Sequence, residues 1–428
     1  MLLQFSVENY KSFKNRTILS LEASSDTEHT NNLTALGKSN VLKVAAIFGA
    51  NAAGKSNLFL ALTTALLLLR LSNTRQMNEP LSLIVPYRFD SESASRPTSF
   101  EFVFTADSMK YVYGFSATRE RIITEYLYKY TTSKPTTVFE RDMNSLPEYK
   151  FTGRSIKSQL SPIVARNTTN KLFLATATTW NCEETKVPLM WLVTGIDTYS
   201  TNYDELIPLI GPMYENDAGA TLRLFTNQIL HEADINIDDY EFKSKEITNE
   251  QFVLQFPPDM RGMISAIPTV KHKQYEISTL HHVNSDSTTS ETFKLNMNDE
   301  SRGTRNLFML SPILKNAFET GVTLCFDEFD TSLHPMLVSY LVGLFNNPEV
   351  NKANAQLIMS THTMDLLSLK ELRRDQIYFV EKDRGTAVSE LYSLDEFSPR
   401  IKEDIRKAYL MGRYGSVPNI CEGETLCL

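Results

Sequence analysis

The pattern of hydrophobic and polar residues divides the chain into three stretches of different texture. In the first, up to about residue 145, the apolar run Val41–Phe48 predicts a buried strand, and Leu58–Leu69 predicts a buried helix. Ser99–Phe104 and Lys110–Phe115 alternate with a period of two, which predicts a pair of antiparallel strands. Their aromatic residues indicate one buried face of a sheet rather than a platform on which bases stack.

The second stretch, from about 146 to 290, is less regular. Ala220–Ala233 has the spacing of a helix, and Phe252–Phe256 reads as a strand. Neither a sustained heptad pattern nor a fixed repeat is visible in the sequence, so we expect neither a long coiled-coil arm nor a repeat array.

In the third stretch, from about 291 to 428, strands alternate with helices again. A helix is predicted up to Phe318, followed by strands after Gly321, at Gln356–Ser360 and at Gln376–Val380. Such alternation favours a parallel or mixed sheet that is covered on both faces. The predicted fold class is therefore α/β, with one mixed sheet shared by 1–145 and 291–428 and a mainly helical segment, 146–290, inserted between them.

Composition narrows the class of protein. The chain has 428 residues, of which 42% are hydrophobic and 22% charged, so disordered and collagen-like classes are excluded. The net charge of −8 is not typical of a nucleic-acid-binding protein, although it does not exclude a local basic groove. Four cysteines without metal-ligand spacing favour a reducing compartment. The start of the chain has no signal-peptide pattern, and Leu58–Leu69 is well short of the ~20 residues that span a bilayer, so we expect a cytoplasmic protein without a membrane partner.

The strongest chemical signal is the segment Gly49–Ser56, which fits the phosphate-binding pattern G-x-x-x-x-G-K-[ST] between a predicted strand and a predicted helix. Gly49 and Gly54 let the chain wrap closely around phosphate, with backbone N–H groups pointing inward. Lys55 would neutralise the β- and γ-phosphates, and Ser56 would place its hydroxyl on Mg²⁺. We therefore expect ATP and Mg²⁺ as ligands, with Asn51 and Asn57 of the same segment among the nucleotide-binding residues.

A second signal follows the apolar run Val322–Phe326, which would deliver Asp327 and Glu328 to the carboxyl edge of a sheet. Asp327 would hold the Mg²⁺ shell, and Glu328 would act as the base that orients the attacking water. An acidic pair that caps a helix is the structural alternative. Lys11 and Lys14 either touch the nucleotide or lie on a solvated turn.

Taken together, the far-apart motifs resemble the ABC-type ATPase heads, in particular the SMC and RecF/RecN groups. Within these, the chain is similar to the AAA-type ATP-binding proteins of abortive-infection and anti-phage operons. The resemblance covers roughly the two outer stretches and is carried, apart from the phosphate-binding segment and the acidic pair, by Val7–Phe13, Phe100–Phe102, Tyr113–Phe115, Glu300–Arg305, Asp330–Pro335, Ser360–Thr363 and Ala408–Gly415.

The resemblance implies roles for further residues. Ser301 and Gly303 would contact the γ-phosphate of ATP bound to a second subunit, and a serine hydroxyl with a glycine N–H at a helix start does make an anion site. His362 would sense the γ-phosphate, as a catalytic residue beside Glu328, and Ser332–His334 would line the junction between subunits. Arg302 and Thr304 stand where the transporter pattern has Gly and Gln.

The function that the resemblance implies is an ATP-hydrolysing switch that forms a dimer or higher oligomer on ATP. It would control an operon-encoded effector, for instance a Toprim-type nuclease, in defence against phage, with DNA or a phage protein as the trigger. The alternative is a DNA repair or maintenance ATPase of the RecF/SMC type that binds DNA directly, which predicts a basic groove and steeply salt-dependent binding.

Overall fold

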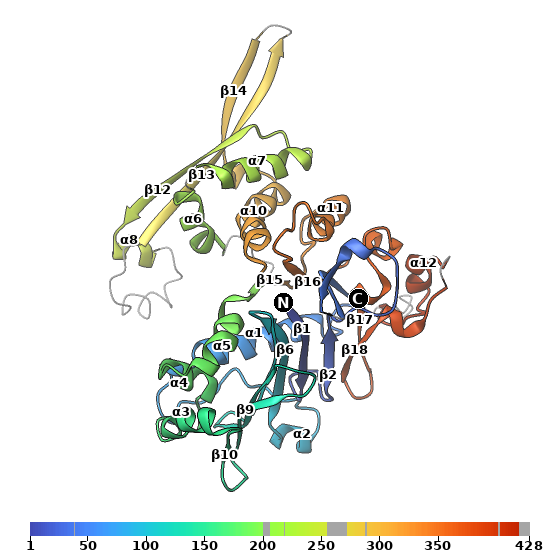
Figure 1. Cartoon of the computed structure of the whole chain (residues 1–428). Coiled ribbons are helices and arrows are strands. Elements are labelled where there is room, and N and C mark those ends of the chain that lie inside the picture. The colour runs from blue at the N-terminus through green and yellow to red at the C-terminus, as the bar shows by residue number, and fades with distance from the viewer. Residues whose placement is uncertain are drawn as a thin grey trace, which may run out of the picture. The chain divides into compact units, whose positions relative to one another are not determined.

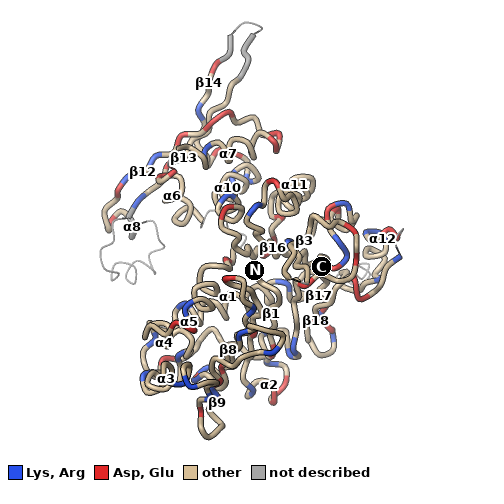
Figure 2. The backbone as a smooth tube through the Cα atoms, in the orientation of Figure 1, with Lys and Arg blue, Asp and Glu red and all other residues tan. Residues whose placement is uncertain are grey.

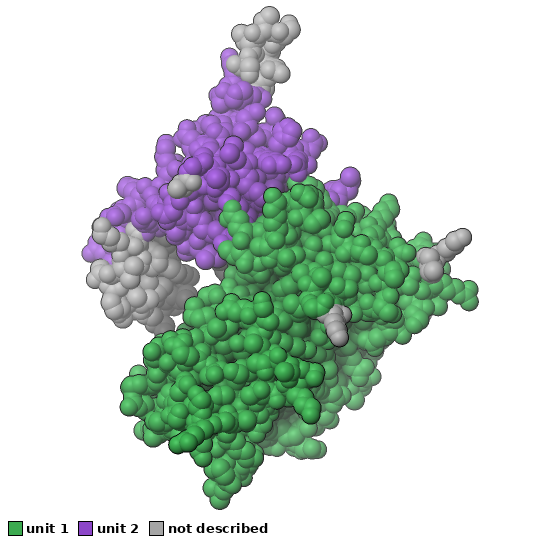
Figure 3. All heavy atoms as spheres, viewed as in Figure 1, with its two compact units in different colours: residues 1–201, 317–330, 338–428 green, residues 202–316, 331–337 purple. Residues whose placement is uncertain are grey.

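The computed structural model describes residues 1–37, 39–199, 206–217, 219–254, 272–286, 289–400 and 403–418 (Figure 1). The chain forms two compact units (Figure 3). Unit 1 comprises Met1–Thr201, Ala317–Asp330 and Val338–Leu428, and unit 2 comprises Asn202–Asn316 and Thr331–Leu337.

The first sheet of unit 1 has seven antiparallel strands in the order β10-β9-β8-β7-β6-β1-β2. Its strands are β1 Leu2–Glu8, β2 Thr17–Ser20, β6 Thr98–Ala106, β7 Met109–Ala117, β8 Ile122–Tyr130, β9 Thr136–Asp142 and β10 Tyr149–Lys150. The predicted hairpin is confirmed, because β6 and β7 pair antiparallel with Phe100 opposite Phe115. Phe100, Phe102 and Phe104 are all buried, so the aromatic residues fill a core and are not available for stacking on bases.

The second sheet of unit 1 is mixed, with six strands in the order β11-β15-β16-β5-β17-β18. Its strands are β11 Ile196–Tyr199, β15 Thr323–Phe326, β16 Gln356–Ser360, β5 Val44–Phe48, β17 Ile377–Lys382 and β18 Ser389–Ser393. All neighbours pair parallel except β17 and β18, which pair antiparallel. The expected α/β fold class with a mixed sheet is therefore confirmed. The mixed sheet contains strands from both outer stretches, as predicted, but it also includes β11 from the segment 146–290, and most strands of residues 1–145 form the separate antiparallel sheet.

Helix α1, Lys55–Arg70, joins the cores of the two sheets. Leu58, Leu62 and Leu66 on α1 belong to one buried cluster with Phe102 of the antiparallel sheet and Ile358 of the mixed sheet. The remaining helices and strands of unit 1 are β3 Leu33–Leu36, β4 Ser39–Leu42, α2 Ser91–Ser95, α3 Arg154–Val164, α4 Phe173–Thr179, α5 Glu183–Thr194 and α12 Ile405–Leu410. Among the described residues, no helix combines the length and the apolar character that crossing a membrane requires.

Unit 2 combines helices with a three-stranded antiparallel sheet, in the order β12-β13-β14. Its elements are α6 Ile207–Glu215, α7 Thr221–Glu232, β12 Asp239–Ile247, α8 Asn249–Leu254, β13 His272–Asp286, β14 Thr289–Asn296 and most of α10, Arg302–Thr320; α11, Pro335–Asn346, starts in unit 2 and continues in unit 1.

The predicted inserted segment and the compact units have different bounds. Residues 146–201, which the sequence placed in the insertion, belong to unit 1. The reason is packing: Leu160 of α3, Phe173 of α4 and Leu192 of α5 are buried in the same cluster as the strands of the antiparallel sheet. A helical pattern shows that one face is buried, but it does not show what covers that face.

The strand predicted at Phe252–Phe256 is wrong for the residues that are described, because α8 occupies 249–254 and residues 255–256 lie outside the described part. Thr248 and Gln251 form a capping box: the Gln251 N–H donates to Thr248 Oγ1 at 3.2 Å, and the Thr248 N–H donates to Gln251 Oε1 at 3.1 Å. This reciprocal pair satisfies N–H groups at a helix start, so the local apolar run continues as a helix.

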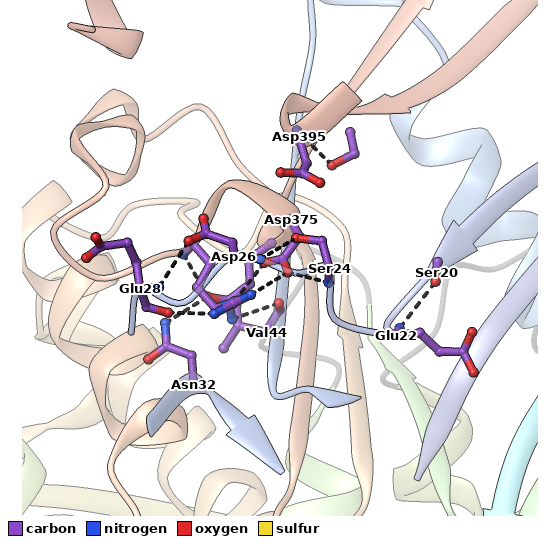
Figure 4. Close-up of polar contacts among 12 residues, drawn as sticks. Ser20, Glu22, Ser24, Asp26, Glu28, Asn32, Val44, Asp375 and Asp395 are labelled. Atoms are coloured by element: carbon purple, nitrogen blue, oxygen red, sulfur yellow. Dashed lines mark hydrogen bonds and ion pairs between the residues drawn. The ribbon is translucent and has the colours of Figure 1, made fainter. Parts of the chain in front are cut away.

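A buried ion pair ties the N-terminal part of unit 1 to its C-terminal part. Arg373 is fully buried and donates to both carboxylate oxygens of Asp375, at 2.9 and 2.8 Å, and to the carbonyl of Glu28 at 2.5 Å. Asp375 also accepts the Ser24 N–H at 2.8 Å, and Figure 4 shows Asp375 beside the segment that carries Ser24 and Glu28.

Arg373→Ala is expected to lower the free energy of unfolding by about 3–5 kcal/mol, because it leaves the Asp375 carboxylate buried without its partner. Chemical denaturation of the two proteins measures this difference. Arg413→Ala is the matched control: its ion pair with Glu403 leaves the Arg413 side chain 60% exposed, so its loss should cost less than about 1 kcal/mol. Equal destabilisation by the two variants would contradict the role of Arg373.

Candidate functional site

The glycine-rich loop Gly49–Ser56 starts at the end of β5, whose five residues are all buried between β16 and β17. Gly49 has no room for a side chain, since a Cβ would lie 2.4 Å from the carbonyl oxygen of Val380. Gly54, with φ of 119°, precedes α1, and a Cβ there would lie 2.4 Å from Ser389 Oγ. Because the first-turn N–H groups of α1 have no acceptor within the helix, the loop ends on a site that attracts anions.

Lys55 is the first residue of α1, and its side chain lies within the loop. Its ammonium donates to the carbonyls of Gly49 at 2.7 Å and Ala50 at 3.3 Å, and the residue is 7% exposed. Burial lowers the pKa of Lys55, and the carboxylates of Asp327, Glu328 and Asp330 offset part of that effect. The three acids therefore lie close enough to Lys55 to act on its charge, although they follow it far along the chain.

Asp327 and Glu328 follow β15, as the sequence predicts. Asp327 is half-buried, and Glu328 is exposed. Ser360, the last residue of β16, donates from its hydroxyl to Asp327 Oδ1 at 2.7 Å and accepts the Glu328 N–H at 2.6 Å. Because β15, β16 and β5 are adjacent and parallel, the acids and the glycine-rich loop share one edge of the sheet.

His362 follows β16 at the same edge. The Thr361 N–H donates to the carbonyl of Ile47 at 3.1 Å, which joins this loop to the strand that leads into Gly49. Asp330 accepts the His362 N–H at 2.8 Å and the Thr363 hydroxyl at 3.1 Å. The His362 side chain is exposed, so its imidazole is accessible to a ligand at this edge.

The other predicted nucleotide-binding residues of the loop differ in their exposure and in their contacts. Asn51 and Ser56 are exposed, whereas Asn57 is half-buried and donates to Ser12 Oγ at 2.8 Å. Asn51 lines a hollow of about 880 Å³ that the β17–β18 turn and residues 410–412 and 415–418 complete.

Lys14 forms an ion pair with Asp90 at 2.9 Å, so a structural contact accounts for its charge.

Ser301 and Gly303 belong to unit 2. Ser301 is exposed and caps α10, because its hydroxyl oxygen accepts the Thr304 N–H at 3.1 Å. A Cβ on Gly303 would lie 2.8 Å from the carbonyl oxygen of Ser332, so glycine allows the start of α10 to approach this loop. Ser332 and His334 are exposed as well. Unit 2 thus presents a helix start with an accessible hydroxyl.

The sequence did not reveal the roles of Ser360 and Asp330, which hold the neighbouring loops. Both residues lie in motifs that carry the family resemblance, but a sequence motif does not indicate which side chains they contact. The available signal for Ser360 is its position: it is a polar residue that directly follows the apolar run Leu357–Met359 at the end of a strand, and it is fully buried. A buried hydroxyl at the edge of a site requires partners, and here the partners are Asp327 and Glu328.

Comparison with known proteins gives one family match. The model of the family described as "AAA domain, putative AbiEii toxin, Type IV TA system" matches residues 44–162 and 223–368, which include the glycine-rich loop, Ser301, both acids and His362. No curated protein matches the chain.

Several solved structures are similar at low identity. An SMC head bound to the C-terminal winged-helix domain of ScpA has 12% identity and a TM-score of 0.44, covering 92% of this chain and 97% of its own. The SMC head domain from Thermotoga maritima has 13% identity and a TM-score of 0.40, covering 92% and 98%. The cbiO1 subunit of an ABC transporter complex from Clostridium perfringens has 13% identity and a TM-score of 0.31, covering 97% and 98%. Since the family match spans more than half of the sequence, the chain belongs to this family of AAA domains.

Proposed function

We propose that the protein binds and hydrolyses ATP with Mg²⁺, and that two copies pair while ATP is bound. One observation carries the proposal: the glycine-rich loop, the acids Asp327 and Glu328, and His362 meet at one edge of the mixed sheet of unit 1. A phosphate-binding loop beside a base and a carboxylate is the arrangement that phosphoryl transfer to water requires.

Each group has a defined task in this reaction. Lys55 and the start of α1 bind and orient the phosphates. Ser56 and Asp327 offer a hydroxyl and a carboxylate, the oxygen ligands that suit Mg²⁺, and a bound Mg²⁺ would supply positive charge that neutralises the phosphates. Glu328 is exposed, so its carboxylate can reach a water molecule and accept its proton. His362 would bond to the γ-phosphate oxygens from the loop that follows β16.

The placement of Ser301 supports the proposed pairing of two copies. Ser301 is exposed at the start of a 19-residue helix, and the partial positive charge of a helix start attracts anions. In the proposal, each copy presents Ser301 and Gly303 to the γ-phosphate held by the other. Hydrolysis removes that phosphate and with it the contact, so the pair opens.

Ser301→Arg is expected to prevent pairing while leaving ATP binding unchanged within about threefold, because the large side chain blocks the anion site of unit 2 and not the loop of unit 1. Light scattering with a non-hydrolysable ATP analogue should show the mass of a dimer for the wild type and of a monomer for the variant. Ser158→Arg, at an exposed serine of α3, is the matched control and should still dimerise. A wild-type protein that stays monomeric with the analogue would contradict the pairing.

The biological role that we propose is control of a partner effector in defence against phage, with the paired, ATP-bound form as one state of the switch. Support comes from the family description, which names a toxin and a toxin–antitoxin system. In the proposal, the effector activity belongs to an operon-encoded partner, for instance a Toprim-type nuclease, and DNA or a phage protein would be the trigger.

Direct action on DNA, the alternative that the sequence left open, finds little support in the distribution of charge. Lys and Arg are interspersed with Asp and Glu along the described chain (Figure 2). The basic residues of the unit 2 sheet illustrate this: Lys273 pairs with Glu215, and Lys294 pairs with Glu241. Basic groups that are neutralised in this way release few counterions on binding to phosphates.

A further inference from the structure

The Ser360 hydroxyl both donates and accepts a hydrogen bond, and it thereby joins the two acids of the site. It is 0% exposed, donates to Asp327 Oδ1 at 2.7 Å and accepts the Glu328 N–H at 2.6 Å. A serine hydroxyl has one hydrogen to donate, and here that hydrogen and one lone pair are both engaged. The neighbouring backbone adds a third bond, since the Phe329 N–H donates to the Ser360 carbonyl at 3.0 Å.

The backbone at Glu328 explains why such a bond is needed. Glu328 has φ of 54°, in the left-handed region that residues with a side chain seldom adopt. A residue keeps such a conformation only where its surroundings hold it there, and these places are concentrated at functional sites. The bonds from Glu328 and Phe329 to Ser360 hold this turn, and the buried side chain of Phe329 anchors its far end.

We propose that Ser360 is a positioning residue that sets the geometry between the metal-binding carboxylate and the catalytic base. The inference rests on the proposed function and assigns a role to a residue outside the motif that carries the acids. Ser360 donates to Oδ1 of Asp327 and so fixes the orientation of the carboxylate that would hold Mg²⁺. The same hydroxyl fixes the amide of Glu328, and therefore the direction in which the Glu328 carboxylate leaves the chain. One side chain thereby couples two catalytic tasks.

A second contact keeps the loops together when Ser360 is changed. Asp330, which follows β15, binds the His362 N–H and the Thr363 hydroxyl after β16. Ser360 at the end of β16 therefore holds the loop after β15, and Asp330 after β15 holds the loop after β16. Since the Asp330 contact does not involve Ser360, a variant that lacks the Ser360 hydroxyl should still fold with both loops in contact.

The test compares Ser360→Ala with Thr323→Val. Thr323 lies at the other end of β15, is also 0% exposed, and donates from its hydroxyl to Gln356 Oε1 at 3.0 Å. Both variants lose one buried hydroxyl between β15 and β16, but only Ser360→Ala loses it at the site. We expect Ser360→Ala to lower kcat about 10- to 100-fold, since small misplacement of a catalytic group costs about that much. The Mg²⁺ concentration for half-maximal turnover should rise at least about threefold, and Mg²⁺-free nucleotide affinity should stay within about threefold.

Ser360→Thr, which keeps the hydroxyl, should recover most of the lost turnover; if its extra methyl group prevents folding, the comparison of the first two variants decides. The proposal is overturned if Ser360→Ala matches Thr323→Val in both kcat and Mg²⁺ dependence, or if both variants lose turnover equally. In either case the wild-type hydrolysis, and with it the proposed function, stands. A wild-type protein that shows no hydrolysis instead refutes the proposed function, and this inference with it.

Discussion

Lys55→Ala is expected to weaken ATP binding by at least about 100-fold, which corresponds to about 2.7 kcal/mol. The ammonium lies inside the glycine-rich loop, where it bonds to two loop carbonyls and where the charges of three carboxylates raise its pKa against the effect of burial. Without it, the phosphates would approach Asp327, Glu328 and Asp330 with no compensating charge from the loop, and like charges repel strongly in a partly buried site. Calorimetric titration with a non-hydrolysable ATP analogue measures the loss.

The control for this variant is Arg70→Ala. Arg70 is the last residue of α1, so the substitution removes one positive charge from the same helix at the end away from the loop. ATP affinity should change by less than about threefold. In cells that express the protein with the proposed operon-encoded effector, Lys55→Ala should also abolish control of that effector, whereas Arg70→Ala should retain it. Binding by Lys55→Ala at the wild-type level would refute the assignment of the loop as the phosphate site.

Glu328→Gln should reduce ATP turnover about 1,000-fold while leaving ATP affinity nearly unchanged. The amide keeps the size of the side chain but cannot accept the proton of the attacking water, and loss of a general base typically costs 10²- to 10⁴-fold. The paired, ATP-bound form should then accumulate, because the step that opens it is blocked. Phosphate release measures turnover, and light scattering with ATP itself measures pairing.

Glu349→Gln provides the comparison, because Glu349 is an exposed glutamate after α11 and lies outside the site. It should hydrolyse ATP at the wild-type rate and show no lasting dimer. If Glu328→Gln kept more than about a tenth of wild-type turnover, Glu328 would not be the base, and another group at this sheet edge would have to take that role.

Some parts of this site were predictable because they depend on short stretches of sequence. Gly49–Ser56 combines two glycines, a lysine and a serine at a fixed spacing after an apolar strand, and that local pattern is enough to predict the loop and α1. Asp327 and Glu328 follow a strand in the same way, and their meeting with the loop follows from parallel pairing through β16.

Other parts depend on contacts between distant residues, which the local pattern does not contain. The Ser360 hydroxyl lies 33 and 32 positions from its two partners, and nothing in the strand Gln356–Ser360 indicates which loop its last side chain will meet. Helix α8 was missed because its start depends on the reciprocal bonds of Thr248 and Gln251, whereas its apolar residues fit a strand equally well. The sequence did not reveal that α3–α5 pack against the antiparallel sheet of unit 1, and the bounds of the insertion were wrong for this reason. A sequence pattern shows that one face of a helix is buried, but it does not show which element covers that face.

The position of β5 in the sheet has a consequence for folding during synthesis on the ribosome. Both neighbours of β5, β16 and β17, come from residues 356–382, so the strand that leads into the nucleotide loop has no partner on either side until most of the chain has been synthesised. During that interval, five apolar residues with unpaired backbone groups on both edges are open to wrong partners. Until residues 356–382 are synthesised, we expect early packing of β5 against α1, with which it shares the buried core, to be the contact that protects this strand.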